Sequence, residues 1–138
     1  GRLLDQVHDR LVRRRSRKVQ ANAQQICEFE KLHTDDAETV VIAYGATARA
    51  ARQAVLAARE RGIRAGLFRL ITLWPFPRGA IKELTNTARR FVVAEMNLGQ
   101  VAREVERYTR RPISWVTHAG GAMFAPEPVL RAIMEARP

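Results

Sequence analysis

Apolar runs of strand length recur along the chain from residue 39 onward. They lie at 39–44, 63–68, 91–96 and 113–116. The first run, TVVIAY, does not alternate apolar and polar residues, which indicates a strand covered on both faces, as in a parallel sheet. The four runs therefore predict four strands, most of them buried under helices.

Segments with helical spacing separate these runs. Small and apolar residues recur three and four positions apart between Thr47 and Arg61, and Gly62 follows, where a helix of this kind commonly ends. Similar patterns predict helices over 100–108 and from Pro126 to Ala136, with the proline at the first turn. This alternation predicts an α/β domain of three layers, α/β/α, with a mainly parallel sheet and right-handed crossovers.

The first 38 residues follow a different pattern. A thin stripe of small and apolar residues at spacings of four and three predicts one long N-terminal helix over residues 3–27. The members of the stripe are Val12, Ser16, Val19, Ala23 and Ile26. The chain is therefore expected to divide into 1–38, a basic helix and an acidic connection to an absent upstream domain, and 39–138, the α/β domain.

The net charge of the 138-residue chain is +10, from 24 basic and 14 acidic residues. Residues 1–20 hold seven basic and two acidic side chains, whereas residues 28–38 hold five acidic side chains and one Lys. A basic run invites a nucleic-acid interpretation. However, no aromatic residue that could stack on bases interleaves with the run 13–18. A solvated or subunit-facing segment is therefore favoured, and nucleic acid is a less favoured partner.

The residue inventory excludes several classes of protein. A single cysteine, Cys27, forms no internal disulfide and indicates a reducing compartment, so a cytoplasmic protein is expected. No run of about 18 apolar residues is present, so no membrane contact is expected. His8, His33 and His118 are too scattered for a metal site. We expect neither a catalytic set nor a metal site, and interpret the start at Gly1 as that of a fragment.

Candidate functional residues are sought in the loops after the strands, where parallel sheets bind ligands and partners. Gly45 and Thr47 could hold an anion at helix amides, or form a tight strand-to-helix turn with Thr47 near the cap position. Glu95 ends an apolar strand, where a carboxylate needs donors. It either accepts hydrogen bonds from the amides around Asn97 and Gly99 or reaches an active site across a subunit boundary.

Two further loops complete the candidates. In WPFP, the prolines fix the backbone, so that Trp74 and Phe76 form either a lid over the core or an aromatic subunit contact. In MNLGQ, Asn97, Gly99 and Gln100 place two amide side chains and a glycine on one turn, which makes it the strongest recognition candidate. The glycine-rich loop 119–124 follows the last strand at the same edge.

Two loop motifs and their neighbours carry a family resemblance over roughly residues 8–135. The segments are Ile71-Thr72-Leu73-Trp74-Pro75-Phe76-Pro77, Val93-Ala94-Glu95-Met96-Asn97-Leu98-Gly99-Gln100 with Val101, Arg103, Glu104, Val105 and Glu106, Asp36-Ala37-Glu38 into Val40-Val41-Ile42-Ala43-Tyr44-Gly45, and Pro126-Glu127. They resemble the alpha subunit of 2-oxoacid:ferredoxin oxidoreductases, nearest to the 2-oxoglutarate type. Leu70 departs from the pattern, which has Pro before Ile-Thr.

The resemblance implies a non-catalytic domain shaped like the C-terminal domain of transketolase, which contacts other subunits. For the whole complex it implies thiamine diphosphate, magnesium and a [4Fe–4S] cluster. The complex would decarboxylate a 2-oxoacid oxidatively with coenzyme A, giving acyl-CoA, carbon dioxide and reduced ferredoxin. The implied partners are the upstream alpha-subunit domain, a beta subunit, ferredoxin and coenzyme A. No cofactor is expected on this fragment, which lacks the cysteines of a cluster.

Two other functions compete with this one. The chain could be the terminal domain of another thiamine enzyme, such as transketolase or a dehydrogenase beta chain. It could also be a stand-alone module whose basic segment binds nucleic acid or acidic partners. A thiamine-binding domain upstream of Gly1 would separate the thiamine enzymes from the stand-alone module.

Overall fold

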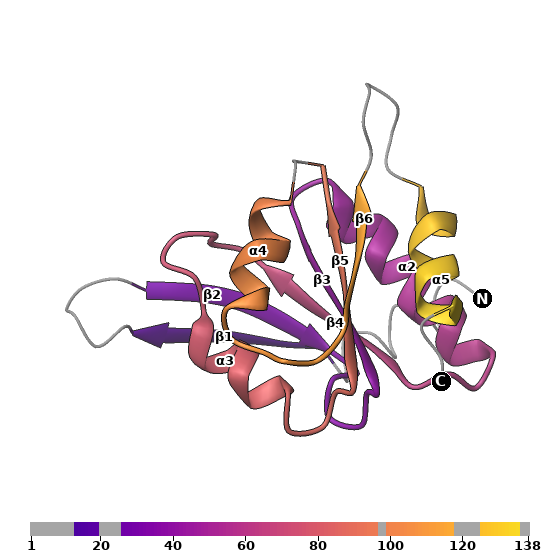
Figure 1. The fold of residues 1–138 in the computed structure, drawn as a ribbon, viewed down its shortest axis with the longest axis horizontal. Coiled ribbons are helices and arrows are strands. Elements are labelled where there is room, and N and C mark those ends of the chain that lie inside the picture. The colour runs from indigo at the N-terminus through magenta and orange to yellow at the C-terminus, as the bar shows by residue number, and fades with distance from the viewer. Residues whose placement is uncertain (1–12, 20–25, 97–98, 118–124, 136–138) are drawn as a thin grey trace.

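The computed structural model describes residues 13–19, 26–96, 99–117 and 125–135. Within these ranges the chain forms six strands and four helices (Figure 1). The strands are β1 (Arg13–Val19), β2 (Ile26–Leu32), β3 (Thr39–Tyr44), β4 (Ala65–Leu70), β5 (Arg90–Glu95) and β6 (Ile113–Thr117). The helices are α2 (Thr47–Glu60), α3 (Arg78–Leu84), α4 (Gln100–Glu106) and α5 (Pro126–Glu135).

The six strands form one sheet in the order β1-β2-β4-β3-β5-β6. β3, β4, β5 and β6 are parallel, and the β1–β2 hairpin is attached antiparallel to β4. The chain moves from β3 to β4 on one side and then crosses to β5 and β6 on the other. This is the mainly parallel α/β sheet that the sequence predicts, with two antiparallel strands added at one edge.

Helices cover both faces of the sheet, and each face has its own apolar core. Alternate residues of β3 point to opposite faces, so that Val40 and Ile42 pack under α3 and α4, whereas Val41 and Ala43 pack under α2 and α5. The unbroken apolar run of β3 is thus explained by burial on both faces. The connection from β3 to β4 and those from β4 to β5 and from β5 to β6 run in opposite directions across the sheet and use opposite faces, as right-handed crossovers require.

The predicted helix over residues 3–27 is wrong where the structure describes the chain, because Arg13–Val19 is strand β1 and Ile26 and Cys27 begin β2. Residues 1–12 and 20–25 lie outside the described ranges. The segment CEFE alternates apolar and acidic residues, and in the structure Cys27 and Phe29 are buried while Glu28 and Glu30 are half-buried. This period of two, and the burial that it allows, prevails over the thin helical stripe.

The hairpin also brings the basic and the acidic segment of the sequence together. Arg17 stands opposite Glu28 in the register, and their side chains form a salt bridge of 3.0 Å. Across the next pair of strands, Glu30 stands opposite Arg69 and accepts from it at 3.2 Å. Residues 28–32 of the acidic segment therefore belong to β2, and the carboxylates of Glu28 and Glu30 lie beside arginines of both neighbouring strands.

Two smaller differences concern the body of the domain. The strand expected at 63–68 begins two residues later, at Ala65, because Ile63 completes the turn after α2. Helix α3 is not foreseen in the sequence, although Ala80, Ile81 and Leu84 bury one side of it. Among the described residues, no helix is both long and apolar enough to cross a bilayer.

Candidate functional site

The carboxyl ends of the parallel strands hold all the predicted candidate residues that the structure describes. Gly45 and Thr47 follow β3, Trp74 and Phe76 follow β4, and Glu95, Gly99 and Gln100 lie at the end of β5. Asn97 and the loop 119–124 lie outside the described residues. β3 and β5 are neighbours whose connections lead to helices on opposite faces, α2 and α4. At such a point an open α/β sheet usually binds its ligand.

Thr47 links the two central strands at this edge. Its buried hydroxyl lies 2.8 Å from the carbonyl oxygen of Tyr44 and 2.9 Å from that of Ala94. The hydroxyl has one proton to donate, which the two carbonyls share. No side-chain cap is formed at the start of α2, so the predicted cap role of Thr47 is replaced by a bridge from β3 to β5. Gly45 before it has a positive φ of 58° and closes the turn.

Glu95 is fully buried and braces helix α4. Its two carboxylate oxygens accept hydrogen bonds from the backbone amides of Val101 at 3.2 Å and Ala102 at 3.0 Å. A negative charge beside the first turn of a helix is also favoured by the helix dipole. This is the bracing arrangement considered from the sequence, and the donors that the structure describes are the amides of Val101 and Ala102 in α4.

Gly99 accommodates a side chain of its own chain. It has φ of 87°, and a Cβ atom at this position would lie 2.9 Å from Cζ2 of Trp115 in β6. The missing side chain thus leaves room for an indole of the same domain. Trp115 was not recognised as a candidate. Its signal is an aromatic residue in a strand adjacent to β5, which can reach a glycine after that strand.

The loop from Ile71 to Pro77 is fastened to the hairpin along its length. The amides of Ile71 and Thr72 donate to the carbonyl oxygen of Glu28 at 3.0 and 3.1 Å, and the amide of Glu28 donates to Thr72 Oγ1 at 2.8 Å. The thiol of the buried Cys27 donates to the carbonyl oxygen of Pro75 at 3.3 Å. Cys27 therefore serves packing and loop placement.

The two aromatic residues of this loop differ in their environment. Phe76 is buried and stacks on Tyr108, which follows α4, with ring centroids 5.9 Å apart. Trp74 is 60% exposed, and its ring lies beside that of Phe76, with the two centroids 6.2 Å apart. Of the two interpretations of the loop, Phe76 fits the lid over the core and Trp74 fits a presented contact residue.

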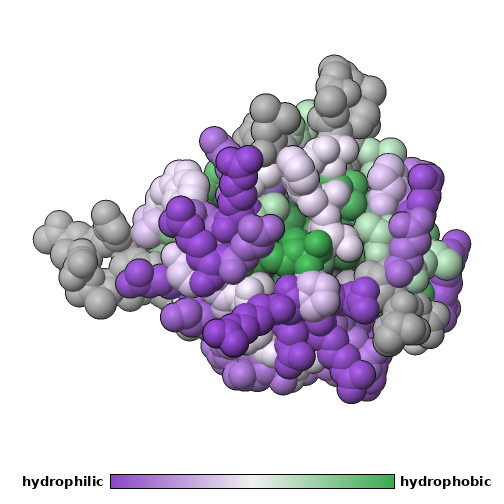
Figure 2. All heavy atoms as spheres, viewed as in Figure 1, coloured by the Kyte–Doolittle hydropathy of each residue, from purple (hydrophilic) through white to green (hydrophobic). Residues whose placement is uncertain are grey.

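The carboxyl edge therefore combines engaged polar groups with exposed apolar ones. Thr47 and Glu95 are satisfied inside the domain, whereas Met96 and Trp115 are 44% and 49% exposed and Gln100 is on the surface. Figure 2 shows hydrophobic atoms at the surface beside α4, among largely hydrophilic neighbours. Such a surface is typical of a domain that contacts other polypeptides at the edge where related sheets bind ligands.

The fold and this edge define a class of protein: a mainly parallel α/β domain whose candidate residues lie at the carboxyl ends of its strands. Residues 37–129 match the model of the family described as pyruvate:ferredoxin oxidoreductase core domain II. The chain belongs to this family.

Curated relatives agree with that assignment. The chain is 38% identical to the 2-oxoglutarate synthase subunit KorA of Methanothermobacter marburgensis over 92% of its length, and 40% identical to that of Methanocaldococcus jannaschii over 94%. It is 41% identical to the ketoisovalerate oxidoreductase subunit VorB of Methanothermobacter thermautotrophicus over 78%. The chain spans about a third of the length of these relatives, between 31% and 35%.

Two solved structures share the fold. One is the 2-oxoglutarate:ferredoxin oxidoreductase of Magnetococcus marinus with 2-oxoglutarate, coenzyme A and succinyl-CoA bound. It has a TM-score of 0.65 and 25% identity, over 72% of this chain and 18% of that chain. The other, a split-gene transketolase, has a TM-score of 0.62 at 20% identity, over 74% of this chain and 39% of that one, which shows the fold alone.

Proposed function

We propose that this chain is the C-terminal domain of the alpha subunit of a thiamine-diphosphate-dependent 2-oxoacid:ferredoxin oxidoreductase, and that it contacts other subunits without supplying a catalytic group. The observation that carries this proposal is that, at the carboxyl edge, the buried polar groups are satisfied within the domain while large apolar side chains are exposed. There, Thr47 and Glu95 are bound to the domain's own backbone, and Trp74, Met96 and Trp115 are exposed. The similarity to KorA subunits over nearly the whole chain supports the same assignment.

The described residues at this edge do not fit a diphosphate site. A diphosphate needs free amides or hydroxyls, but the Thr47 hydroxyl and the amides of Val101 and Ala102 already have acceptors. We therefore assign thiamine diphosphate, magnesium and the [4Fe–4S] cluster to the upstream alpha-subunit domain and the beta subunit. On this view the segment that leads to the upstream domain lies before β2, because Phe29 and Leu32 of β2 belong to the two cores of the contact domain.

The complete enzyme is proposed to work in the cytoplasm with coenzyme A and ferredoxin. It would convert a 2-oxoacid, coenzyme A and oxidised ferredoxin into acyl-CoA, carbon dioxide and reduced ferredoxin. 2-Oxoglutarate is the favoured substrate, because the relatives that match over 92% and 94% of the chain are 2-oxoglutarate synthase subunits. Because two other relatives are ketoisovalerate oxidoreductase subunits, a branched-chain 2-oxoacid is the second substrate to compare with 2-oxoglutarate.

The test uses the full-length alpha subunit, produced together with its beta subunit. The purified complex should reduce ferredoxin when 2-oxoglutarate and coenzyme A are added, and should do so faster than with a branched-chain 2-oxoacid. The proposal would be contradicted if the complex assembled and bound thiamine diphosphate, but no added 2-oxoacid led to the reduction of ferredoxin.

A surface residue of the turn after β5 tests the contact role itself. Gln100 is exposed at the start of α4, so Gln100→Ala should change the melting temperature of the alpha subunit by less than about 1 °C. In the complex, the same change should weaken alpha–beta association or lower turnover several-fold. A melting temperature lowered by several degrees, with unchanged activity per folded complex, would show that the turn is only structural.

A further inference from the structure

A chain of aromatic contacts runs from the loop after β4 to the end of α4. Trp74 touches Phe76, Phe76 stacks on Tyr108, and Nζ of Lys82 in α3 lies 5.8 Å from the centroid of the Tyr108 ring. We call the surface formed by Trp74, Lys82, Arg103, Arg107 and Tyr108 the loop–α4 surface. Its residues come from a loop and two helices that are far apart in the sequence.

The loop holds Trp74 at a fixed place on this surface. On one side of the tryptophan, Thr72 exchanges hydrogen bonds with Glu28, and on the other the carbonyl of Pro75 accepts from the Cys27 thiol. Phe76, two residues after Trp74, is buried in the core. An exposed aromatic side chain on a braced loop loses little conformational freedom when it is buried by a partner. Trp74 therefore has the properties of an interface anchor.

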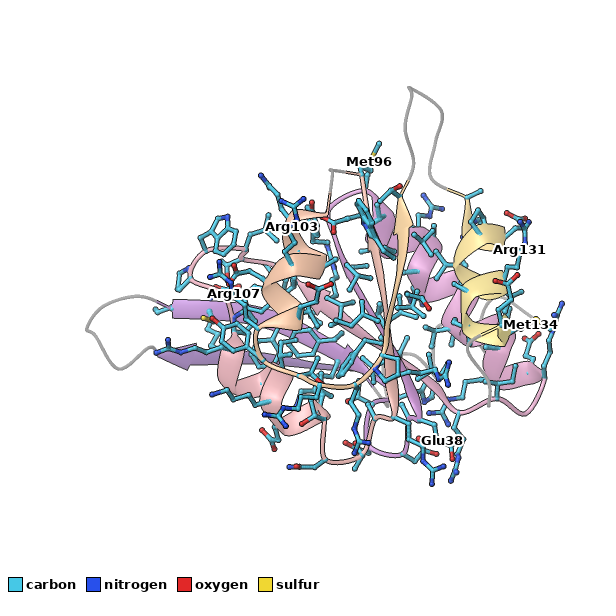
Figure 3. The ribbon with its side chains drawn as sticks, in the orientation of Figure 1. Glu38, Met96, Arg103, Arg107, Arg131 and Met134 are labelled. Atoms are coloured by element: carbon cyan, nitrogen blue, oxygen red, sulfur yellow. The ribbon has the colours of Figure 1, made fainter. Side chains whose placement is uncertain are left out.

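The cations around this anchor are only partly neutralised. Arg103 and Arg107 stand four residues apart, hence on one face of α4, and Figure 3 shows both side chains directed away from the sheet. Arg107 is 3.4 Å from Glu104, with its side chain 69% exposed. Within the described residues, Arg103 makes no ion pair. Figure 2 shows hydrophilic side chains gathered over α4 beside the loop.

We propose that the loop–α4 surface docks a partner subunit whose surface presents carboxylates around an apolar pocket, with Trp74 in the pocket and Arg103 and Arg107 against the carboxylates. This rests on the proposed function, in which the domain is built into a multi-subunit enzyme. Tryptophan and arginine are the residue types that most often dominate interface energetics. Charge complementarity identifies the occupant as acidic and excludes a second copy of this surface, which would bring the same cations together.

A protein partner is favoured over a nucleic acid. A single-stranded nucleic acid binds to several exposed aromatic faces in succession, whereas here Phe76 is buried and Tyr108 is covered by Phe76 and Lys82. Glu104 also lies within the basic face, beside Arg107. A single exposed indole, surrounded by both basic and acidic side chains, fits a pocket on a folded protein better than it fits a run of stacked bases.

The first test compares two exposed apolar side chains, Trp74 and Met134, in the full-length alpha subunit. Association with the beta subunit is measured by biolayer interferometry, and folding by thermal melting. Trp74→Ala should raise the dissociation constant at least tenfold and leave the melting temperature unchanged. Met134→Ala, in α5 on the opposite face of the sheet, should change the dissociation constant less than twofold. Equal effects of the two variants on association would overturn the proposal.

The second test compares two exposed arginines on opposite faces of the sheet. Arg103 lies on α4 and Arg131 on α5 (Figure 3). Arg103→Ser should slow association several-fold and reduce its dependence on salt, whereas Arg131→Ser, with the same loss of charge, should leave both unchanged. Equal effects would show that only net charge matters and would overturn the proposal.

The outcomes also separate this inference from the proposed function. Reduction of ferredoxin by the wild-type complex tests the function, and the binding measurements test the docking surface without any turnover. If the variants leave subunit association unchanged but abolish binding of a labelled single-stranded oligonucleotide, the surface is a nucleic-acid site and the docking proposal fails.

Discussion

The hydroxyl of Thr47 and the carboxylate of Glu95 show how single residues decide the character of the carboxyl edge. Both are buried polar groups, and such groups cost stability unless they are hydrogen-bonded. Each is satisfied by backbone of a neighbouring element, Thr47 across two strands and Glu95 at the start of a helix. The edge is therefore held rigid by the groups that a ligand would otherwise use.

The bridge formed by Thr47 can be measured by removing its hydroxyl. Thr47→Val keeps the shape of the side chain but leaves the carbonyls of Tyr44 and Ala94 without this donor. The free energy of unfolding should fall by about 1–3 kcal/mol in urea denaturation. Thr47→Ser keeps the hydroxyl and is the matched control, with a smaller loss from the missing methyl group. Equal losses in the two variants would assign the effect to packing.

At the scale of elements, the turn after β5 and strand β6 are fitted to each other. Gly99→Ala would add a Cβ at 2.9 Å from the Trp115 ring and force a side chain onto a backbone with φ of 87°. It should lower the free energy of unfolding by roughly 1–3 kcal/mol.

A double-mutant cycle separates the two causes. In a Trp115→Ala background the ring is gone, so Gly99→Ala should cost only the backbone strain and therefore less than in the wild type. An equal cost in both backgrounds would show that the ring and the glycine do not interact.

The elements of the body could be predicted because burial and periodicity agree there. β3, α2, β5 and α4 lie within a residue or two of their predicted bounds. The hairpin could not be predicted in this way. The helical stripe of residues 3–27 is only one residue wide, and Phe29 and Leu32 pair with Leu70 and Leu67, which lie 41 and 35 residues further along the chain. Helix α3 was missed because its seven residues give too short a window for a periodic signal.

The same limit applies to the candidate site. The sequence places Glu95, Gly99 and Trp74 at one edge, because that follows from the order of strands and loops. It does not reveal that Trp115 fills the space beside Gly99 or that Tyr108 stacks on Phe76. Those pairings depend on the order of strands in the sheet and on the position of α4, which local patterns do not encode.

At the scale of the whole molecule, a network at the opposite end of the parallel strands ties the turn between β2 and β3, helix α2 and the start of β4 together. The guanidinium of Arg59 donates to both carboxylate oxygens of Asp36 at 2.6 and 3.1 Å, to the carbonyl oxygen of His33 at 2.8 Å and to that of Ala65 at 2.7 Å. This arginine fixes three segments at once, at a distance from the candidate site along the strands.

The network gives a pH dependence of stability. The hydrogen bond from Arg59 holds the pKa of Asp36 below its ordinary value of 3.8. A depressed pKa stabilises the folded chain above that ordinary value, and the contribution is lost as the pH falls through the folded-state pKa. Asp36→Asn should therefore lower stability at pH 7 and make no difference in strong acid.

The size of this effect is limited by solvent. The Asp36 side chain is 57% exposed, so its interaction with Arg59 is screened by water and should shrink further in 1 M salt. Urea denaturation of the wild type and the variant from pH 7 to pH 2 measures the difference. A difference that persists unchanged at pH 2 would show that the carboxylate charge is not its source.

Strand β1 is attached to the described structure only through β2, and β2 is attached to β4 over only four residue pairs, from Phe29 to Leu32. The two apolar cores include Phe29 and Leu32 of β2. β1 can therefore open locally while β2 keeps these two side chains in the cores, at a far lower free-energy cost than global unfolding. Each opening would bare the outer edge of β2 and release a strand of which five of seven residues are cationic. The domain would then have two native-like states that differ in where this charge lies.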